Sequence, residues 1–149
     1  MGLETNLPRT FLGLTFSCEP HHIFGAIIRG ICFGTRTILD CFKYGGYTST
    51  EMTVGGGATA SRLWMQIHAD TAGIPVRIPG STDAPSMGSA ILAAHGAGHF
   101  ASIDEGIDAM VKPGVLIEPD PVATAAYENV YQQYRALYPV LKQVREQAK

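Results

Sequence analysis

Apolar residues return every three or four positions along five stretches of the chain, a spacing that predicts five helices with one buried face each. The first helix is expected from Pro20 to about Phe42, before a turn at residues 45–46. The second follows the glycines at 55–57 and stops at Gly73, and the third is capped by Asp83 or Ser86. Ser102 and Glu105 form a capping box for a short fourth helix. The last begins at Pro121, with Asp120 as its cap.

Short apolar runs between these helices predict strands at residues 11–16, 51–54 and 74–78. Two of them flank the second helix, and a strand-helix-strand order implies a parallel pair. The chain is therefore expected to be α/β, with short strands and long packing helices. Gly30 and Gly34 lie inside the first helix, where each costs about 1 kcal/mol against alanine. We expect close packing of another backbone to explain them.

Three consecutive glycines, Gly55 to Gly57, join the end of a strand to the start of a helix. Glycine leaves backbone amides uncovered, and the amino end of a helix favours polar or anionic ligands. The pattern is neither the GxGxxG dinucleotide fingerprint, because Ala58 and Thr59 follow, nor a P-loop, because no Gly-Lys-Ser/Thr follows. A turn needed only for tight strand-to-helix packing is the structural alternative.

Composition limits the class of protein. The 149 residues are 46% hydrophobic and 16% charged, with a formal net charge of −2, which fits one globular domain. The 11 Lys and Arg form no basic stripe, so nucleic acid is not expected as a partner. No signal core or apolar run of membrane-spanning length appears, and we expect a cytoplasmic protein without a membrane partner. Cys18, Cys32 and Cys41 form no CxxC motif and are expected to be free thiols.

Candidate catalytic and metal-binding residues all have simpler structural explanations. Asp83 and Asp120 are expected to be helix caps, and the acidic residues at 104, 105 and 108 to lie in a short exposed helix. The histidine pairs at 21–22 and at 95 and 99 suggest metal-ligand spacing, but each local group lacks a third ligand. No catalytic residue and no metal ligand is therefore assigned. Trp64 is expected to pack beneath the glycine turn, and the tyrosines of the last helix to be core and rim residues.

Longer strings of the sequence resemble one family. GGGATASRLWMQIHADTAGIPV, from Gly55 onward, resembles the adenosine-contacting segment of the FGGY carbohydrate kinases. FLGLTFSCEPHHIFGAIIRGICFGTRTILD upstream resembles the family's "F-x-G-L" strand and its "A-x-x-E-G-x-A-F" helix, with Arg29 where the family usually has an acid. DAPSMGSAILAAHGAG and EPDPVATAAYENVYQQYRALYPVL resemble the family's small-residue helix and its closing tyrosine-rich helix. The resemblance covers nearly the whole chain in order.

The resemblance implies an actin-like, ribonuclease-H-like domain of an ATP-dependent sugar or polyol kinase. It assigns Gly55, Gly56, Gly57 and Ala58 to the nucleotide and Ser61 to a small polar position near the adenine, with ATP or ADP as the ligand. The family's Mg²⁺ ligands, sugar site and proton-accepting aspartate are expected in a preceding domain, so residues 1–149 would be a partial C-terminal domain, inactive alone. Five-carbon sugars or polyols are the expected substrates.

A partial domain would leave apolar helix faces and strand edges uncovered. We therefore expect self-association, strand borrowing or a companion chain. The alternative function is a non-catalytic binding or assembly module derived from the same fold, in which the glycine turn is purely structural.

Overall fold

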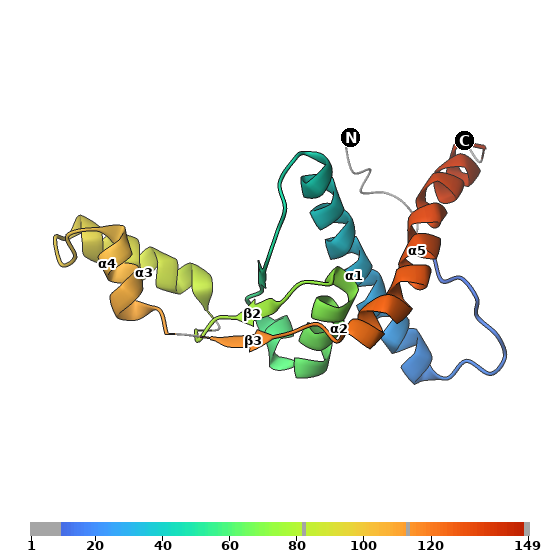
Figure 1. Ribbon diagram of the computed structural model, residues 1–149, viewed down its shortest axis with the longest axis horizontal. Coiled ribbons are helices and arrows are strands. Elements are labelled where there is room, and N and C mark those ends of the chain that lie inside the picture. Colours follow the sequence, from blue (N-terminus) through green and yellow to red (C-terminus); the bar gives the residue numbers. More distant parts are fainter. Residues whose placement is uncertain (1–9, 82, 113, 148–149) are drawn as a thin grey trace.

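The computed structural model describes residues 10–81, 83–112 and 114–147, apart from the side chain of residue 145. The chain alternates helices with very short strands (Figure 1). In order, the elements are α1 (Pro20–Tyr44), β1 (Met52–Thr53), the 3-10 turn η1 (Gly57–Ala60), α2 (Arg62–Ala72), β2 (Val76–Ile78), α3 (Ala84–Gly96), α4 (Ile103–Met110), β3 (Val115–Ile117) and α5 (Pro121–Gln147). No helix in these ranges is both long and apolar enough to cross a membrane.

The helix boundaries follow the capping residues of the sequence. Asp83 accepts a hydrogen bond from the Ser86 N–H at the start of α3, and Asp120 accepts one from the Val122 N–H at the start of α5. Gly73 ends α2 in the left-handed region, at φ 68°. These predictions are confirmed, as is the short helix α4. The capping box predicted for α4 is formed in part. The Ser102 hydroxyl accepts a hydrogen bond from the Glu105 N–H, but the Glu105 carboxylate accepts one from the Ala101 N–H, one residue before the cap.

The three strands form one small sheet in the order β1-β2-β3. β1 and β2 are parallel, with Met52 opposite Val76, as the strand-helix-strand order predicts. β3 runs antiparallel to β2, with Ile117 opposite Val76. β3 was not predicted from the sequence, because its continuous apolar run shows no alternation and its partner β2 lies about forty residues upstream.

Two expectations are wrong. Residues 11–16 form no strand but an exposed loop and turn in which Leu12 is 72% and Leu14 57% exposed. An apolar run becomes a strand only where another strand pairs with it, and none among the described residues does. The glycines of α1 do not receive another backbone: a Cβ at Gly30 would meet nothing within 4 Å, and one at Gly34 would meet the Tyr134 hydroxyl at 3.7 Å.

The core is centred on α2, which packs against α1, α5 and the sheet. Met65 and Ala69 on α2 meet Val76 on β2 and Ile117 on β3, and all four are at most 3% exposed. Between α1 and α5, the Phe33 ring contacts the tyrosine rings of α5, among which Tyr131 is 1% exposed. Buried Asp70 joins α2 to the start of α5 by accepting the Asp120 N–H at 2.8 Å. We call α1, α2, α5 and the sheet the body.

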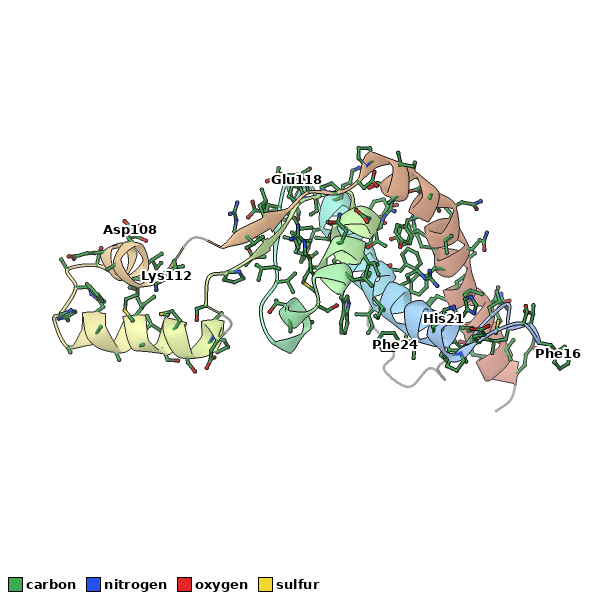
Figure 2. The ribbon with its side chains drawn as sticks, turned by 90° about the horizontal axis from the view of Figure 1, so that it is seen from below. Phe16, His21, Phe24, Asp108, Lys112 and Glu118 are labelled. Carbon is green, nitrogen blue, oxygen red and sulfur yellow. The ribbon has the colours of Figure 1, made fainter. Side chains whose placement is uncertain are left out.

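α3 and α4 pack against each other as a hairpin that extends away from the body (Figures 1 and 2). α1 carries an exposed apolar stripe. It includes Phe24, Ile27, Ile31, Ile38 and Phe42, each 46–65% exposed.

Candidate functional site

The triple-glycine bend lies on the surface between β1 and η1. Gly55, Gly56 and Gly57 are exposed, and a Cβ at Gly56 or Gly57 would meet nothing within 4 Å. Gly56 has φ 89°, a conformation that other residues rarely adopt, so a glycine is required here by the turn itself. Thr59 fixes the bend by donating both its N–H and its hydroxyl to the Gly56 carbonyl, at 3.1 and 2.7 Å.

The backbone amides of the bend are available to a ligand. Within the described part of the chain, no hydrogen bond is donated by the N–H groups of residues 55–58. Four successive free donors on an exposed turn form an arrangement that can bind an anion or a polar ring edge. The bend is thus an open surface rather than an enclosed cavity.

The next residues anchor the bend to the core. The Ala58 side chain is half-buried and packs with Trp64 against the cluster around Met65. Trp64 is packed against the same cluster, so its place beneath the glycine turn stays a prediction, and its buried Nε1–H has no hydrogen-bond partner among the described residues. Ser61 is exposed, and its hydroxyl caps α2 by accepting the Trp64 N–H at 3.3 Å. Only one lone pair of that hydroxyl is used, so it can still bond to a ligand.

The amino ends of two helices lie close to the bend. α2 begins directly after η1, and a Cβ at Gly55 would come within 3.9 Å of the Ala84 Cβ at the start of α3. Both ends carry partial positive charge from their free N–H groups. Arg62, the first residue of α2, adds an exposed cation that makes no ion pair with the residues described. Arg62 was not predicted as a candidate residue, although it directly follows Ser61 and is the first residue of the second helix.

The nearest charged pair belongs to the sheet and not to the bend. Arg77 on β2 donates from Nε and Nη2 to the two carboxylate oxygens of Glu51, at 2.5 and 2.6 Å. The hydrogen bonds from Arg77 hold the pKa of Glu51 below its usual value. Neither group is therefore free to act on a ligand at the bend.

The histidines and acids considered for metal binding or catalysis lie apart. His21 and His22 both contact Glu19 at the start of α1, and His95 pairs with the Phe100 carbonyl on the hairpin. Among residues 10–81, 83–112 and 114–147, no three His, Cys, Asp or Glu side chains are grouped to hold a metal ion. Asp83 and Asp120 are occupied as helix caps.

The chain was compared with known proteins. The model of the FGGY family of carbohydrate kinases, C-terminal domain, matches residues 1–97. The xylulose kinase of Staphylococcus epidermidis is 30% identical over 141 residues, or 95% of this chain and 28% of that protein. The ribulokinase of Bacillus licheniformis is 31% identical over 142 residues, or 91% of this chain and 26% of that protein.

The fold agrees with this relationship. The crystal structure of xylulose kinase from Rhodospirillum rubrum matches with a TM-score of 0.78 and 30% identity, over 91% of this chain and 28% of that one. The chain has the architecture of part of an actin-like ATPase domain, as expected from the sequence. It spans between a quarter and 28% of the length of the relatives named here. The match over residues 1–97 and the shared fold together show that this chain belongs to the FGGY family of carbohydrate kinases, within its C-terminal domain.

Proposed function

We propose that the triple-glycine bend forms one wall of the nucleotide site of an ATP-dependent carbohydrate kinase. The observation that carries this proposal is the row of free N–H donors at Gly55, Gly56, Gly57 and Ala58, beside the amino ends of α2 and α3. In this arrangement the bend lies along the nucleotide. The free lone pair of the Ser61 hydroxyl accepts a hydrogen bond from the adenine, and the Arg62 guanidinium pairs with the phosphates.

We infer that residues 1–149 are the nucleotide side of a larger catalytic unit, a partial C-terminal domain. Phosphoryl transfer needs a base, an oriented hydroxyl and Mg²⁺ in one place. Among the described residues, Asp83 and Asp120 cap helices, Glu51 is paired with Arg77, and no three Asp, Glu, His or Cys side chains are grouped to hold a metal ion. The proton-accepting group, the Mg²⁺ ligands and the sugar site therefore come from polypeptide beyond these residues, and the chain alone transfers no phosphate.

The proposed acceptor is a five-carbon ketose or polyol. The support is the activity named for two relatives, a xylulose kinase and a ribulokinase, each about 30% identical to this chain.

The uncovered apolar stripe of α1 implies a covering polypeptide. Its five large side chains are each 46–65% exposed, and contiguous exposed apolar side chains mark surfaces that bind another polypeptide. We infer that the isolated chain self-associates or takes up a companion chain through this face. Size exclusion with light scattering tests this directly: a monodisperse monomer at micromolar concentration would contradict it.

The nucleotide site can be tested with two matched glycine variants. Gly56 and Gly46 both have a positive φ, 89° and 88°, and a Cβ at either would meet nothing within 4 Å. Alanine is therefore strained in both turns by the backbone angle and not by a clash. Gly56→Ala is expected to weaken MgADP binding in titration calorimetry by about tenfold, because the bend must reshape, whereas Gly46→Ala leaves binding unchanged.

The same titration can contradict the proposal. Wild-type chain that gives no heat and no rise in melting temperature with MgADP would favour the alternative role as a non-catalytic assembly module. An equal loss in both variants would show that the bend contributes only to folding.

A further inference from the structure

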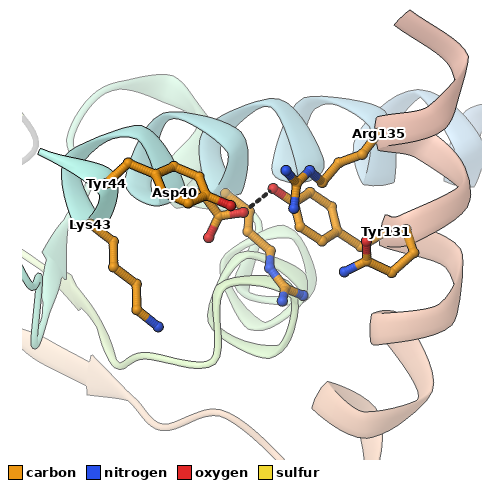
Figure 3. A pocket seen from close by; sticks show the side chains of 7 residues that line it. Asp40, Lys43, Tyr44, Tyr131 and Arg135 are labelled. Atoms are coloured by element: carbon orange, nitrogen blue, oxygen red, sulfur yellow. Dashed lines mark hydrogen bonds between the residues drawn. The ribbon is translucent and has the colours of Figure 1, made fainter.

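A hollow of about 440 Å³ opens between the carboxyl-terminal half of α1 and the middle of α5. Its lining includes Asp40, Lys43 and Tyr44 from α1, and Tyr131 and Arg135 from α5 (Figure 3). None of these residues belongs to the bend. The volume falls in the range of small-molecule sites.

Polar contacts between α1 and α5 fix the side chains that line the hollow; we call these contacts the frame. Tyr131, 1% exposed, donates its hydroxyl to the Asp40 Oδ2 at 2.5 Å. The Arg36 guanidinium lies 4.0 Å from the Tyr131 ring centroid and is paired with Glu128. Burial, and then the hydrogen bond to Asp40, raise the pKa of Tyr131, so the phenol keeps its proton and remains a donor. Because each of these groups is bonded across the two helices, the frame is set before any ligand arrives.

Two cations of the hollow keep donors for a ligand. Lys43 makes no ion pair with any acid in the described ranges. The Arg135 guanidinium makes none either, but it is hydrogen-bonded to the Tyr44 hydroxyl and interacts with the charge of Asp40, which leaves its remaining N–H groups for a ligand. Figure 3 shows the two side chains on opposite sides of Asp40, one from each helix. With the Asp40 carboxylate between them, the two cations still leave the hollow with an excess of positive charge, and a phosphate can accept hydrogen bonds from both an ammonium and a guanidinium.

The Asp40 carboxylate in the same hollow favours a ligand that also carries a hydroxyl group. Asp40 uses Oδ2 for the Tyr131 hydroxyl, and its other oxygen has no donor among the described residues. A free carboxylate oxygen repels a bare phosphate and accepts hydrogen bonds from alcohols. The lining therefore combines donors for an anion with an acceptor for a hydroxyl.

We propose that the hollow between α1 and α5 binds a small phosphorylated polyol, with Lys43 and Arg135 on the phosphate and Asp40 on a hydroxyl. This site is separate from the nucleotide site and does not depend on it. A ligand bound here touches both helices at once, so it stabilises the packing of α1 against α5.

Ribose 5-phosphate is a suitable probe, compared with ribose and with inorganic phosphate in titration calorimetry. Lys43→Gln and Arg135→Gln are each expected to weaken ribose 5-phosphate binding by about tenfold, the loss of one charged hydrogen bond. Lys142→Gln is the matched control, because it removes the same charge from α5 at a residue that pairs only with Glu146, outside the hollow. It is expected to leave binding unchanged.

Asp40→Asn tests the hydroxyl contact. Wild-type chain should prefer ribose 5-phosphate over inorganic phosphate, and the variant should lose that preference by binding inorganic phosphate more tightly. The helical circular-dichroism signal verifies that each variant is folded. Failure of ribose 5-phosphate to bind wild type, an equal loss in Lys142→Gln, or equal affinity of wild type for inorganic phosphate would each overturn the proposal. Gly56→Ala should not change ribose 5-phosphate binding, which separates this test from that of the nucleotide site.

Discussion

The body and the α3–α4 hairpin are stabilised in different ways. In the body, buried residues from α1, α2, α5 and the sheet meet around Met65, and polar links such as Asp70 to the Asp120 N–H join the helices. In the hairpin, the described buried residues are Ile91 and Gly106, which touch each other. The body therefore has one shared core, while the hairpin depends on one small contact. The bend lies where the two regions approach, at Gly55 and Ala84.

The largest effect on the free energy of unfolding is expected from truncating one buried side chain in the body and, separately, one in the hairpin. Met65→Ala removes a fully buried side chain from the body and should lower the free energy of unfolding by about 2–5 kcal/mol. Ile91→Ala, at 4% exposure, should instead loosen the hairpin with little change in the main unfolding transition. Urea denaturation followed by circular dichroism measures both. A single transition lowered equally by the two variants would contradict the independence of the regions.

A smaller effect is expected where the two hairpin helices touch. A Cβ at Gly106 would lie 2.8 Å from the Ile91 Cγ2 and 3.0 Å from the Phe100 ring. Gly106→Val should therefore push α4 from α3 at a cost of about 1–3 kcal/mol, the usual cost of overpacking. Hydrogen exchange is expected to rise at hairpin amides and to stay unchanged in α2. Gly88→Val is the control, because a Cβ there would meet nothing within 4 Å.

The body should also respond to pH through His68 on α2. His68 is 7% exposed, and burial lowers its pKa below the usual value of 6.5. Below pH 6.5, His68 is protonated in the unfolded chain but stays neutral in the folded chain. The free energy of unfolding is therefore highest above about pH 6.5 and falls as the pH drops below it. The slope contributed by this one group is at most about 1.4 kcal/mol per pH unit.

Urea midpoints from pH 7.5 to 5 measure the slope, and His68→Gln should flatten it. His99→Gln, on the exposed end of the hairpin, should leave it unchanged. An unaltered slope in His68→Gln would show that other groups cause the pH dependence.

The two serine caps give the smallest expected change. Ser61→Ala and Ser102→Ala remove the hydroxyls that cap α2 and α4, and each should cost its own helix about 1 kcal/mol. The cost of Ser61→Ala should appear in the melting temperature of the body, while that of Ser102→Ala should remain within the hairpin. MgADP titration adds a second difference, since Ser61→Ala alone is expected to weaken binding.

The local features of the fold could be predicted from the sequence, because caps and glycine stops act within a few residues. Asp120 and Gly73 set helix ends in this way. Pairing between distant segments could not be predicted. The apolar run at residues 11–16 resembles a strand as much as β3 does, but only β3 has β2 beside it.

The same limit applies to the sites. The glycine bend is local, so its exposure and its free amides follow from residues 55–61. The hollow joins residues about ninety positions apart, and the only local signal was charge at helical spacing, with Arg36, Asp40 and Lys43 on one face of α1. Nothing in that spacing indicated that Tyr131 would face them.

The most direct test of the nucleotide proposal is amide mapping by NMR. The backbone N–H signals of Gly55, Gly56 and Gly57 should shift in nitrogen-proton spectra as MgADP is added to the labelled chain, since these donors would bind the ligand. The amides of Gly45 and Gly46, in an exposed turn away from the bend, should not move. Saturable shifts at the bend and none at residues 45–46 are the predicted result. Unmoved bend amides at saturating MgADP, or shifts confined to other parts of the chain, would contradict it.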